Sequence, residues 1–453
     1  MSEYTSHSIN YGIVGRMKMR FGFPFALKLS IFLISLFVLS ITFLTLLTAY
    51  AQEEFRQREF VENGDPQLVD SRLRVDEVTS GLDTPTTMAF LGPNDILVLE
   101  KDKGTVQRVI NGKISGAPLL DVNVANSVER CMCGIAISKH DSKTYVFLYY
   151  TEINGKDGED RQGKEPIANR LYRYELLGNK LVDPLLLLEL PANPGPRHNG
   201  GAIIIGPDEN LYVPVGDVDG SFKEEDTETV TQNYNYGVGA DGRSGILRIT
   251  QNGQPAGPGI LGDSLPLSLY YAYGIRNSFG LGFDPVTGNL WETENGPGEG
   301  DEINLVEPGF NSGWQQVHGV AKSTSGFDPK DLVEFNGKGH YRDPELVWQN
   351  TVGPTALLFM RSDKLGSQYV NDMFVGDVHN DRIYHFDLSE DRTHLVLPPE
   401  LAGRVIKNPK ADGLDQIIFG EEFGGISDLK IGPDGYLYVV SVGLGKIFKI
   451  VPA

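Results

Sequence analysis

The chain has 453 residues, of which 53 are glycine and 26 are proline. This turn-rich composition argues against long helices and favours an all-β domain built from many short strands. The formal net charge of −20 disfavours nucleic acid and anionic lipid surfaces as partners, because a field of that sign repels them.

The first 51 residues have the pattern of an export or anchor segment. Basic residues precede an uncharged apolar run at 29–47, and the small-residue pattern Ala49-Tyr50-Ala51 follows it. The run is long enough to cross a bilayer as a helix, so residues 1–51 are predicted to be a cleaved signal peptide or a membrane anchor. Because the basic flank stays in the cytoplasm, residues from 52 onward are expected outside it, secreted or tethered to the membrane.

Residues 52–74 are polar, carry alternating charges and predict a linker. In 75–453 a short turn, usually Gly-Pro or Asp-Pro, repeatedly leads into an apolar strand, often followed by a second strand. The copies begin at Leu91, Gly206, Asp284, Asn371 and Gly432. Asn, Asp and Gly suit hairpin turns that need positive φ, and a repeated hairpin is typical of propeller blades.

The number of blades follows from the spacing of these copies. Residues 75–453 would hold roughly eight or nine compact blades of about 40–45 residues each. The visible repeats are fewer and unevenly spaced, so we predict a six-bladed β-propeller with long inserted loops, for example at 217–243 and 315–345. A jelly roll or β-sandwich is the alternative fold.

Cys131 and Cys133 are the two cysteines of the chain. With one residue between them they are too close for a relaxed disulfide, and one such pair cannot frame a zinc site. We expect packed structural thiols, with a labile redox pair as the alternative.

Three loops carry side chains suited to chemistry. His198 precedes two glycines and an apolar strand, and a histidine can act as a general base near neutral pH. Arg276 can polarise a carbonyl, and Asn277 adds a donor and an acceptor. The segment 294–305 is dense in carboxylates and glycine, which suits the oxygen ligands of calcium. Taken alone, each motif is also typical of a solvated loop, a surface ion pair or an acidic turn.

Together these segments resemble the pyrroloquinoline-quinone (PQQ)-dependent aldose and glucose dehydrogenase family. The resemblance runs from about residue 75 to the C-terminus, and its most specific block is 273–314. It implies a six-bladed propeller that binds PQQ on its top face and oxidises an aldose sugar to its lactone. The electrons would pass to an external acceptor, and the protein would supply orientation and electrostatics while the cofactor carries the redox chemistry.

The resemblance also implies roles for residues around the cofactor. His198 matches the general base that takes the sugar's hydroxyl proton, and Arg276 matches the residue that polarises the quinone carbonyl. Three further residues match, or lie near, cofactor contacts, namely Asn277, Thr351 and Glu129.

The same resemblance implies bound calcium. Gly296 and Pro297 match the backbone carbonyls that hold a calcium ion against the cofactor. Asp301 and Glu302 match ligands of further structural calcium.

The sequence departs from the family pattern in the cofactor region. Ile275 replaces a usual histidine, and Arg197 stands where an acidic neighbour of the base is common. The family's basic cofactor-clamping residues have no clear match, and Lys364, His379 and Arg382 are only candidates. Two other functions stay open: a propeller without chemistry that binds a glycan or protein, and a calcium-dependent propeller lactonase.

Overall fold

The computed structural model describes residues 65–218, 233, 239–407 and 413–453. The chain divides into two units, 1–59 and 60–453. The first unit lies outside the described residues, as do the expected signal or anchor helix and most of the expected insertion at 217–243. In the part of the chain that is described, no helix is both long and apolar enough to cross a membrane.

Strands dominate the described residues, and the helices among them are single 3-10 turns. These are η1 (Glu159–Gln162), η2 (Leu267–Leu269), η3 (Ala321–Ser323), η4 (Pro329–Asp331), η5 (Ser367–Tyr369), η6 (Pro399–Leu401) and η7 (Leu414–Gln416).

The strands pair, mainly antiparallel, into six sheets. The first two sheets contain β3 (Pro85–Gly92), β4 (Asp95–Glu100), β5 (Thr105–Ile110), β6 (Lys113–Ile114) and β7 (Leu120–Asp121), then β8 (Met132–His140), β9 (Lys143–Glu152), β10 (Ala168–Leu177) and β11 (Lys180–Leu190). The third contains β12 (Ile204–Ile205), β13 (Leu211–Val215), β14 (Gly245–Ile249), β15 (Tyr270–Tyr273), β19 (Phe310–Asn311) and β20 (His340–Tyr341). The fourth contains β16 (Ser278–Phe283), β17 (Leu290–Glu294), β18 (Asp301–Val306), β21 (Leu346–Trp348) and β26 (Val405–Ile406). The last two contain β22 (Pro354–Phe359), β23 (Met373–Asp377), β24 (Ile383–Leu388), β25 (Leu395–Val396), β27 (Ile418–Glu421) and β1 (Gln67–Leu68), then β28 (Ile426–Ile431), β29 (Leu437–Ser441), β30 (Lys446–Pro452) and β2 (Leu73–Thr79).

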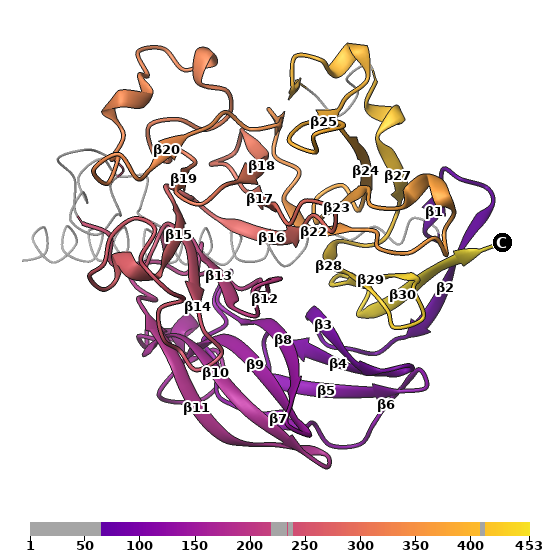
Figure 1. Ribbon diagram of the computed structural model, residues 1–453. Helices are drawn as coiled ribbons and strands as arrows, with labels where there is room; N and C mark the ends of the chain where they lie inside the picture. The colour runs from indigo at the N-terminus through magenta and orange to yellow at the C-terminus, as the bar shows by residue number, and fades with distance from the viewer. Residues whose placement is uncertain (1–64, 219–232, 234–238, 408–412) are drawn as a thin grey trace, which may run out of the picture. The chain divides into compact units, whose positions relative to one another are not determined.

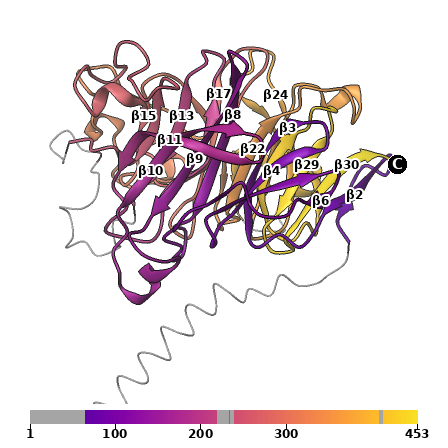
Figure 2. The same cartoon turned by 90° about the horizontal axis from the view of Figure 1, so that it is seen from below.

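The sheets are set around a common centre, so the described residues form an all-β propeller (Figures 1 and 2). The strands nearest the centre are β3, β8, β12, β16, β22 and β28, one from each sheet (Figure 1). Contacts run from β3 to β8, β8 to β12, β16 to β22, β22 to β28 and β28 back to β3, and β13 contacts β16.

The N-terminal strands close this ring. β2 pairs with β30, so that Leu73 lies opposite Pro452, and β1 pairs with β27. The expected linker at 52–74 therefore ends earlier than predicted, because residues 67–68 and 73–74 belong to strands. Without them, two sheet edges would expose unpaired backbone groups.

The core lies between neighbouring sheets, and the second strand of a sheet is often buried on both faces. β13, β17 and β29 are buried along their whole length. β13 and β29 are among the apolar runs behind the sequence repeat, which explains why that repeat was visible, whereas β17 also buries Glu292 and Glu294. Turns before the second strand of a sheet use positive φ where expected, at Asn94 before β4 with 57° and at Gly435 before β29 with 84°.

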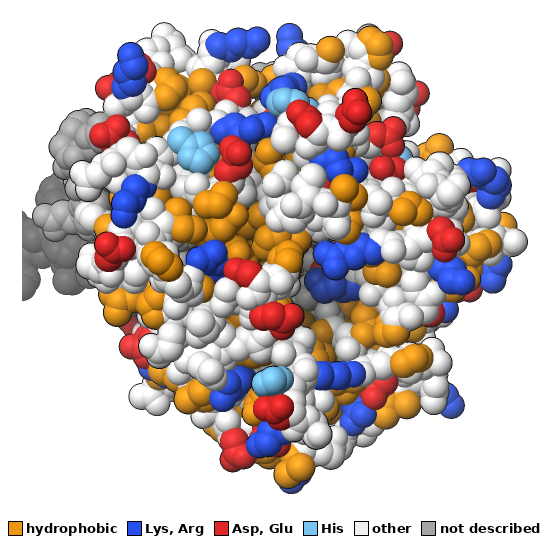
Figure 3. Space-filling view, viewed as in Figure 1, with side chains coloured by type: hydrophobic (Ala, Val, Ile, Leu, Met, Phe, Trp, Pro, Cys, Tyr) orange, Lys and Arg blue, Asp and Glu red, His pale blue; other side chains and the backbone are white. Residues whose placement is uncertain are grey.

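Surface charge is mixed rather than gathered. On the face shown in Figure 3, acidic and basic side chains lie among hydrophobic ones, and both signs occur near the centre. The net charge of −20 is therefore not concentrated there as one acidic patch.

Candidate functional site

The predicted site residues share one position in the fold. Glu129 precedes β8, His198 precedes β12, Arg276 and Asn277 precede β16, and Thr351 precedes β22. The loops that enter the innermost strands meet at one end of the propeller, as the hydrogen bonds below establish.

His198 is held in a demanding conformation. It is 3% exposed, and its φ of 57° lies in the left-handed region, which costs a residue with a Cβ about 1–2 kcal/mol. Its Nδ1 lies 2.6 Å from Asp217 Oδ1, and Trp314 Nε1 donates to the other oxygen of that carboxylate at 2.7 Å. When Nδ1–H donates to Asp217, Nε2 carries the lone pair and can accept a proton.

Glu129 joins two candidate residues from different sheets. Its Oε2 accepts from the His198 backbone N–H at 2.7 Å and from Asn277 Nδ2 at 3.2 Å. One carboxylate therefore fixes both loops relative to each other.

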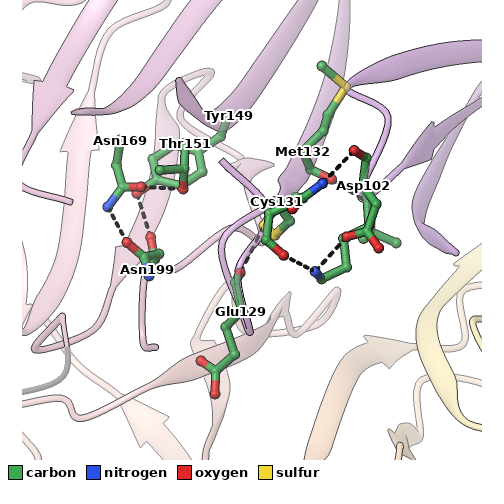
Figure 4. Close-up of a disulfide and its surroundings, with 12 residues drawn as sticks. Asp102, Glu129, Cys131, Met132, Tyr149, Thr151, Asn169 and Asn199 are labelled. Atoms are coloured by element: carbon green, nitrogen blue, oxygen red, sulfur yellow. Dashed lines mark hydrogen bonds and ion pairs between the residues drawn. A yellow bond between two sulfur atoms is a disulfide. The ribbon is translucent and has the colours of Figure 1, made fainter. Parts of the chain in front are cut away.

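The residue after His198 is anchored by the second sheet. Tyr149 Oη donates to the Asn199 carbonyl at 2.7 Å, and Asn169 Nδ2 donates to Asn199 Oδ1 at 3.0 Å (Figure 4). These contacts help to hold the strained histidine, since such a conformation persists only where its surroundings over-determine it.

Arg276 is buried next to the His198–Asp217 pair. Its Nη1 donates to the carbonyls of Asn295 at 2.6 Å and Gly296 at 2.9 Å, and its guanidinium lies 5.3 Å from the Trp314 ring centroid. Burial lowers the pKa of Arg276, and the negative charges of Asp217 and Glu129 oppose that shift. A guanidinium starts from so high a pKa that the group stays charged.

Asp301 joins the predicted calcium loop to the loop that holds Thr351. Its Oδ1 accepts from Gly296 N at 2.8 Å, and its Oδ2 accepts from Val352 N at 2.7 Å and Gly353 N at 2.9 Å. Burial raises the pKa of Asp301, and these three N–H donors oppose the rise. The side chain positions both loops, with Pro297 and Thr351 each next to a bonded residue.

Glu302 forms a cluster of three buried carboxylates with Glu292 and Glu294. Asn304 Nδ2 donates to Glu302 at 3.0 Å and to Glu292 at 3.2 Å, while Ser312 Oγ donates to Glu294 at 2.6 Å. Burial raises the pKa of Glu292 to about 8 and of Glu294 to about 7, and it raises the pKa of Glu302 strongly. The cluster thus favours protons or a cation.

The expectation of free structural thiols was wrong, because Cys131 and Cys133 form a disulfide (Figure 4). The register of β8 against β9 shifts between Met132 and Gly134. This irregularity brings the two Cα atoms to 5.2 Å, within the range that a disulfide spans. Sequence spacing alone did not reveal the shift.

Sequence reasoning gave no role to Asp217 and Trp314, which hold the histidine. The signal available for Asp217 was an acidic residue soon after the buried strand β13.

The three residues considered as basic cofactor clamps lie in two different regions of the propeller. His379 donates its backbone N–H to Val352 O at 3.0 Å, and Arg382 pairs with Glu421 in the same β23–β24 region. Lys364 follows β22 and therefore lies at the opposite end of the strands.

Comparisons with known proteins agree with this architecture. The model of the glucose / sorbosone dehydrogenase family matches residues 82–449. An aldose sugar dehydrogenase of Escherichia coli is 24% identical over 388 residues, covering 84% of this chain and 93% of that protein. Quinoprotein glucose dehydrogenase B of Acinetobacter calcoaceticus is 27% identical over 311 residues, covering 64% and 61% respectively. The PQQ-bound aldose sugar dehydrogenase of Streptomyces coelicolor shares the fold, with a TM-score of 0.57, 23% identity and coverage of 85% and 99%.

Proposed function

Since the chain belongs to the glucose / sorbosone dehydrogenase family, we propose that it oxidises an aldose sugar to its lactone with PQQ as cofactor. The observation that carries the proposal is the buried His198–Asp217 pair next to Arg276 at the end of the propeller where the predicted site loops meet. Among the relatives, one is named a quinoprotein and another was solved with PQQ bound.

The residues present fit such a cofactor. Arg276 Nε and Asn277 Oδ1 are buried and have no hydrogen-bond partner among the described residues. A buried orphan donor and a buried orphan acceptor are costly, so both favour a ligand that can satisfy them. PQQ carries carbonyl and carboxylate acceptors and a ring N–H donor. When bound, it would supply the hydride acceptor.

The protein's own groups would handle the proton and the charge. His198 Nε2 would take the proton of the sugar's anomeric hydroxyl, and Asp217 would stabilise the imidazolium that results. Arg276 would hold negative charge that develops next to it, in a buried site where such an interaction is strong. Asn277 and Thr351 would contact the cofactor, and Glu129 would keep His198 and Asn277 in register.

The test is single-turnover reduction of bound PQQ by a panel of aldoses. His198→Ala should slow reduction by about 10²- to 10⁴-fold while PQQ still binds. His140→Ala is the matched control, since that histidine is exposed and Asp141 is its one ion-pair partner among the described residues. Equal rates in wild type and His198→Ala would remove the histidine from the mechanism, and negligible rates in both would favour the glycan- or protein-binding alternative.

We also propose calcium in the 296–302 loop, with the Gly296 and Pro297 carbonyls near the cofactor and Glu302 in the buried carboxylate cluster. The support is the density of oxygen donors and the raised pKa values of the carboxylates. Asp301 already accepts three N–H groups, so its role would be to shape the loop. Chelation should lower the melting temperature, because an ion bound by the native state stabilises it by mass action. An unchanged melting temperature would contradict this proposal.

Two further proposals concern the whole chain. We propose six blades, one for each sheet, supported by the contacts that run from sheet to sheet around the centre. We also propose that residues from 52 onward lie outside the cytoplasm, supported by the basic flank and apolar run before them. Protease added to intact cells should digest the propeller unless it is already released, and complete protection until lysis would contradict export.

A further inference from the structure

We propose that Asp372, His385 and Asp387 bind a transition-metal cation of the Zn²⁺ type, at the end of the propeller opposite the candidate active site. One ligand atom from each of the three side chains lies within 4.8 Å of the others. The proposed sugar oxidation uses none of these residues, so the inference stands independently of it.

The β23–β24 hairpin builds the cluster. His385 and Asp387 are two positions apart on β24, so their side chains lie on the same face of the sheet. Met373 pairs with Phe386, which places Asp372 next to Asp387 at the open end of the hairpin. The closed end contacts the loop at 351–353, so the length of the hairpin separates the cluster from that loop.

The distances suit a small cation. Metal–ligand bonds of about 2.0–2.1 Å in a tetrahedron place neighbouring ligand atoms roughly 3.4 Å apart. His385 Nε2 lies 2.9 Å from Asp372 Oδ2 and 3.8 Å from Asp387 Oδ1, which brackets that separation. The His385 ring is also held by packing, with ring centroids 5.2 Å from Tyr369 and 5.0 Å from Phe374.

The two neighbouring carboxylates of the cluster favour the binding of a cation. Within the described residues, His385 is the one basic side chain that forms an ion pair with either carboxylate. A neutral imidazole can donate from Nε2 to only one of them, and the two carboxylates repel each other. A divalent ion would satisfy both carboxylates and the imidazole lone pair.

The ligand set also selects the metal. One imidazole and two carboxylates with open positions suit Zn²⁺ or Co²⁺, whereas calcium takes six to eight oxygens. Saturating calcium should therefore not compete at this site.

The test uses Co²⁺ as a spectroscopic probe, with the untagged full-length chain in saturating calcium. We expect one equivalent to bind with visible d–d absorption, and Zn²⁺ to displace it. His385→Ala and Asp387→Asn should each weaken binding by at least about tenfold. His140→Ala should not, because within the part of the chain that the structure describes His140 has a single aspartate, Asp141, as its acidic partner. Asp387 is exposed, so Asp387→Asn should still fold and can test the site even if His385→Ala misfolds. Absence of binding in wild type, or equal binding in the cluster variants, would overturn the proposal.

Discussion

At the scale of single residues, the candidate site depends on close backbone approach as much as on functional groups. Gly216 lies between the His198 and Arg276 loops. A Cβ added there would lie 2.7 Å from His198 Cβ and 2.6 Å from the His198 carbonyl oxygen, with the Arg276 carbonyl also in contact. Real Cβ atoms do not approach so closely, so something must move.

We therefore expect Gly216→Ala to displace His198 and to lower the rate of sugar oxidation by roughly 10- to 100-fold, as when a partner that orients a functional group is lost. Gly92→Ala is the control, because a Cβ there would meet no atom within 4 Å. Steady-state assays with both variants, together with melting curves, would separate displacement from unfolding. Full activity in Gly216→Ala would mean that the loops tolerate the shift.

At the scale of elements, the buried carboxylates of the fourth sheet make the stability of the fold depend on pH. A carboxyl whose pKa is raised on folding binds its proton more tightly in the native state than in the unfolded chain. For Glu292 the pKa rises from 4.5 to about 8, so its contribution to stability is present at low pH and is lost as pH rises through that interval.

We expect the melting temperature to fall between about pH 5 and pH 8, and Glu292→Gln to flatten that fall because the amide stays neutral. Glu390→Gln, at an exposed position, should leave the profile unchanged. Calcium bound in the cluster should also flatten it. Identical profiles for wild type and Glu292→Gln would contradict the assignment of the pH dependence to this cluster.

The Cys131–Cys133 disulfide belongs to the same scale, because it lies at the start of β8, two residues from Glu129. A loop this short contributes only about 1–2 kcal/mol through the unfolded state. Its larger effect should be on the position of Glu129, whose carboxylate holds His198 and Asn277. The double change Cys131→Ser with Cys133→Ser should therefore reduce activity more than stability. The opposite pattern, full activity with a large loss of melting temperature, would make the disulfide purely structural.

At the scale of the whole molecule, ring closure depends on the first described strands. β1 and β2 complete sheets whose other strands come from the C-terminal half of the chain. A chain that begins at residue 80 would leave β27 and β30 with unpaired edges, and exposed edges invite association.

We expect that shortened chain to melt at a lower temperature and to aggregate, whereas a chain that begins at residue 65 keeps both strands and should behave like wild type. Size-exclusion chromatography and melting curves would compare the two. A monomeric, equally stable chain from residue 80 would show that the propeller closes without these strands.

The sequence by itself determined the all-β class and the positions of several hairpins, and it predicted which loops carry the chemistry. The reason is local: buried strands such as β13 and β29 are largely apolar runs, and turns at Asn94 and Gly435 need residues that accept positive φ. Only the tertiary structure decided which loops meet. Asp217 is 19 residues from His198, and Glu129 is 148 residues from Asn277, so neither contact follows from local pattern. The disulfide depended on a shift of strand register, and the buried carboxylate cluster depended on the pairing of β17 with β18, which sets Glu294 opposite Glu302. These features arise from non-local pairing, which sets burial and distance independently of spacing along the chain.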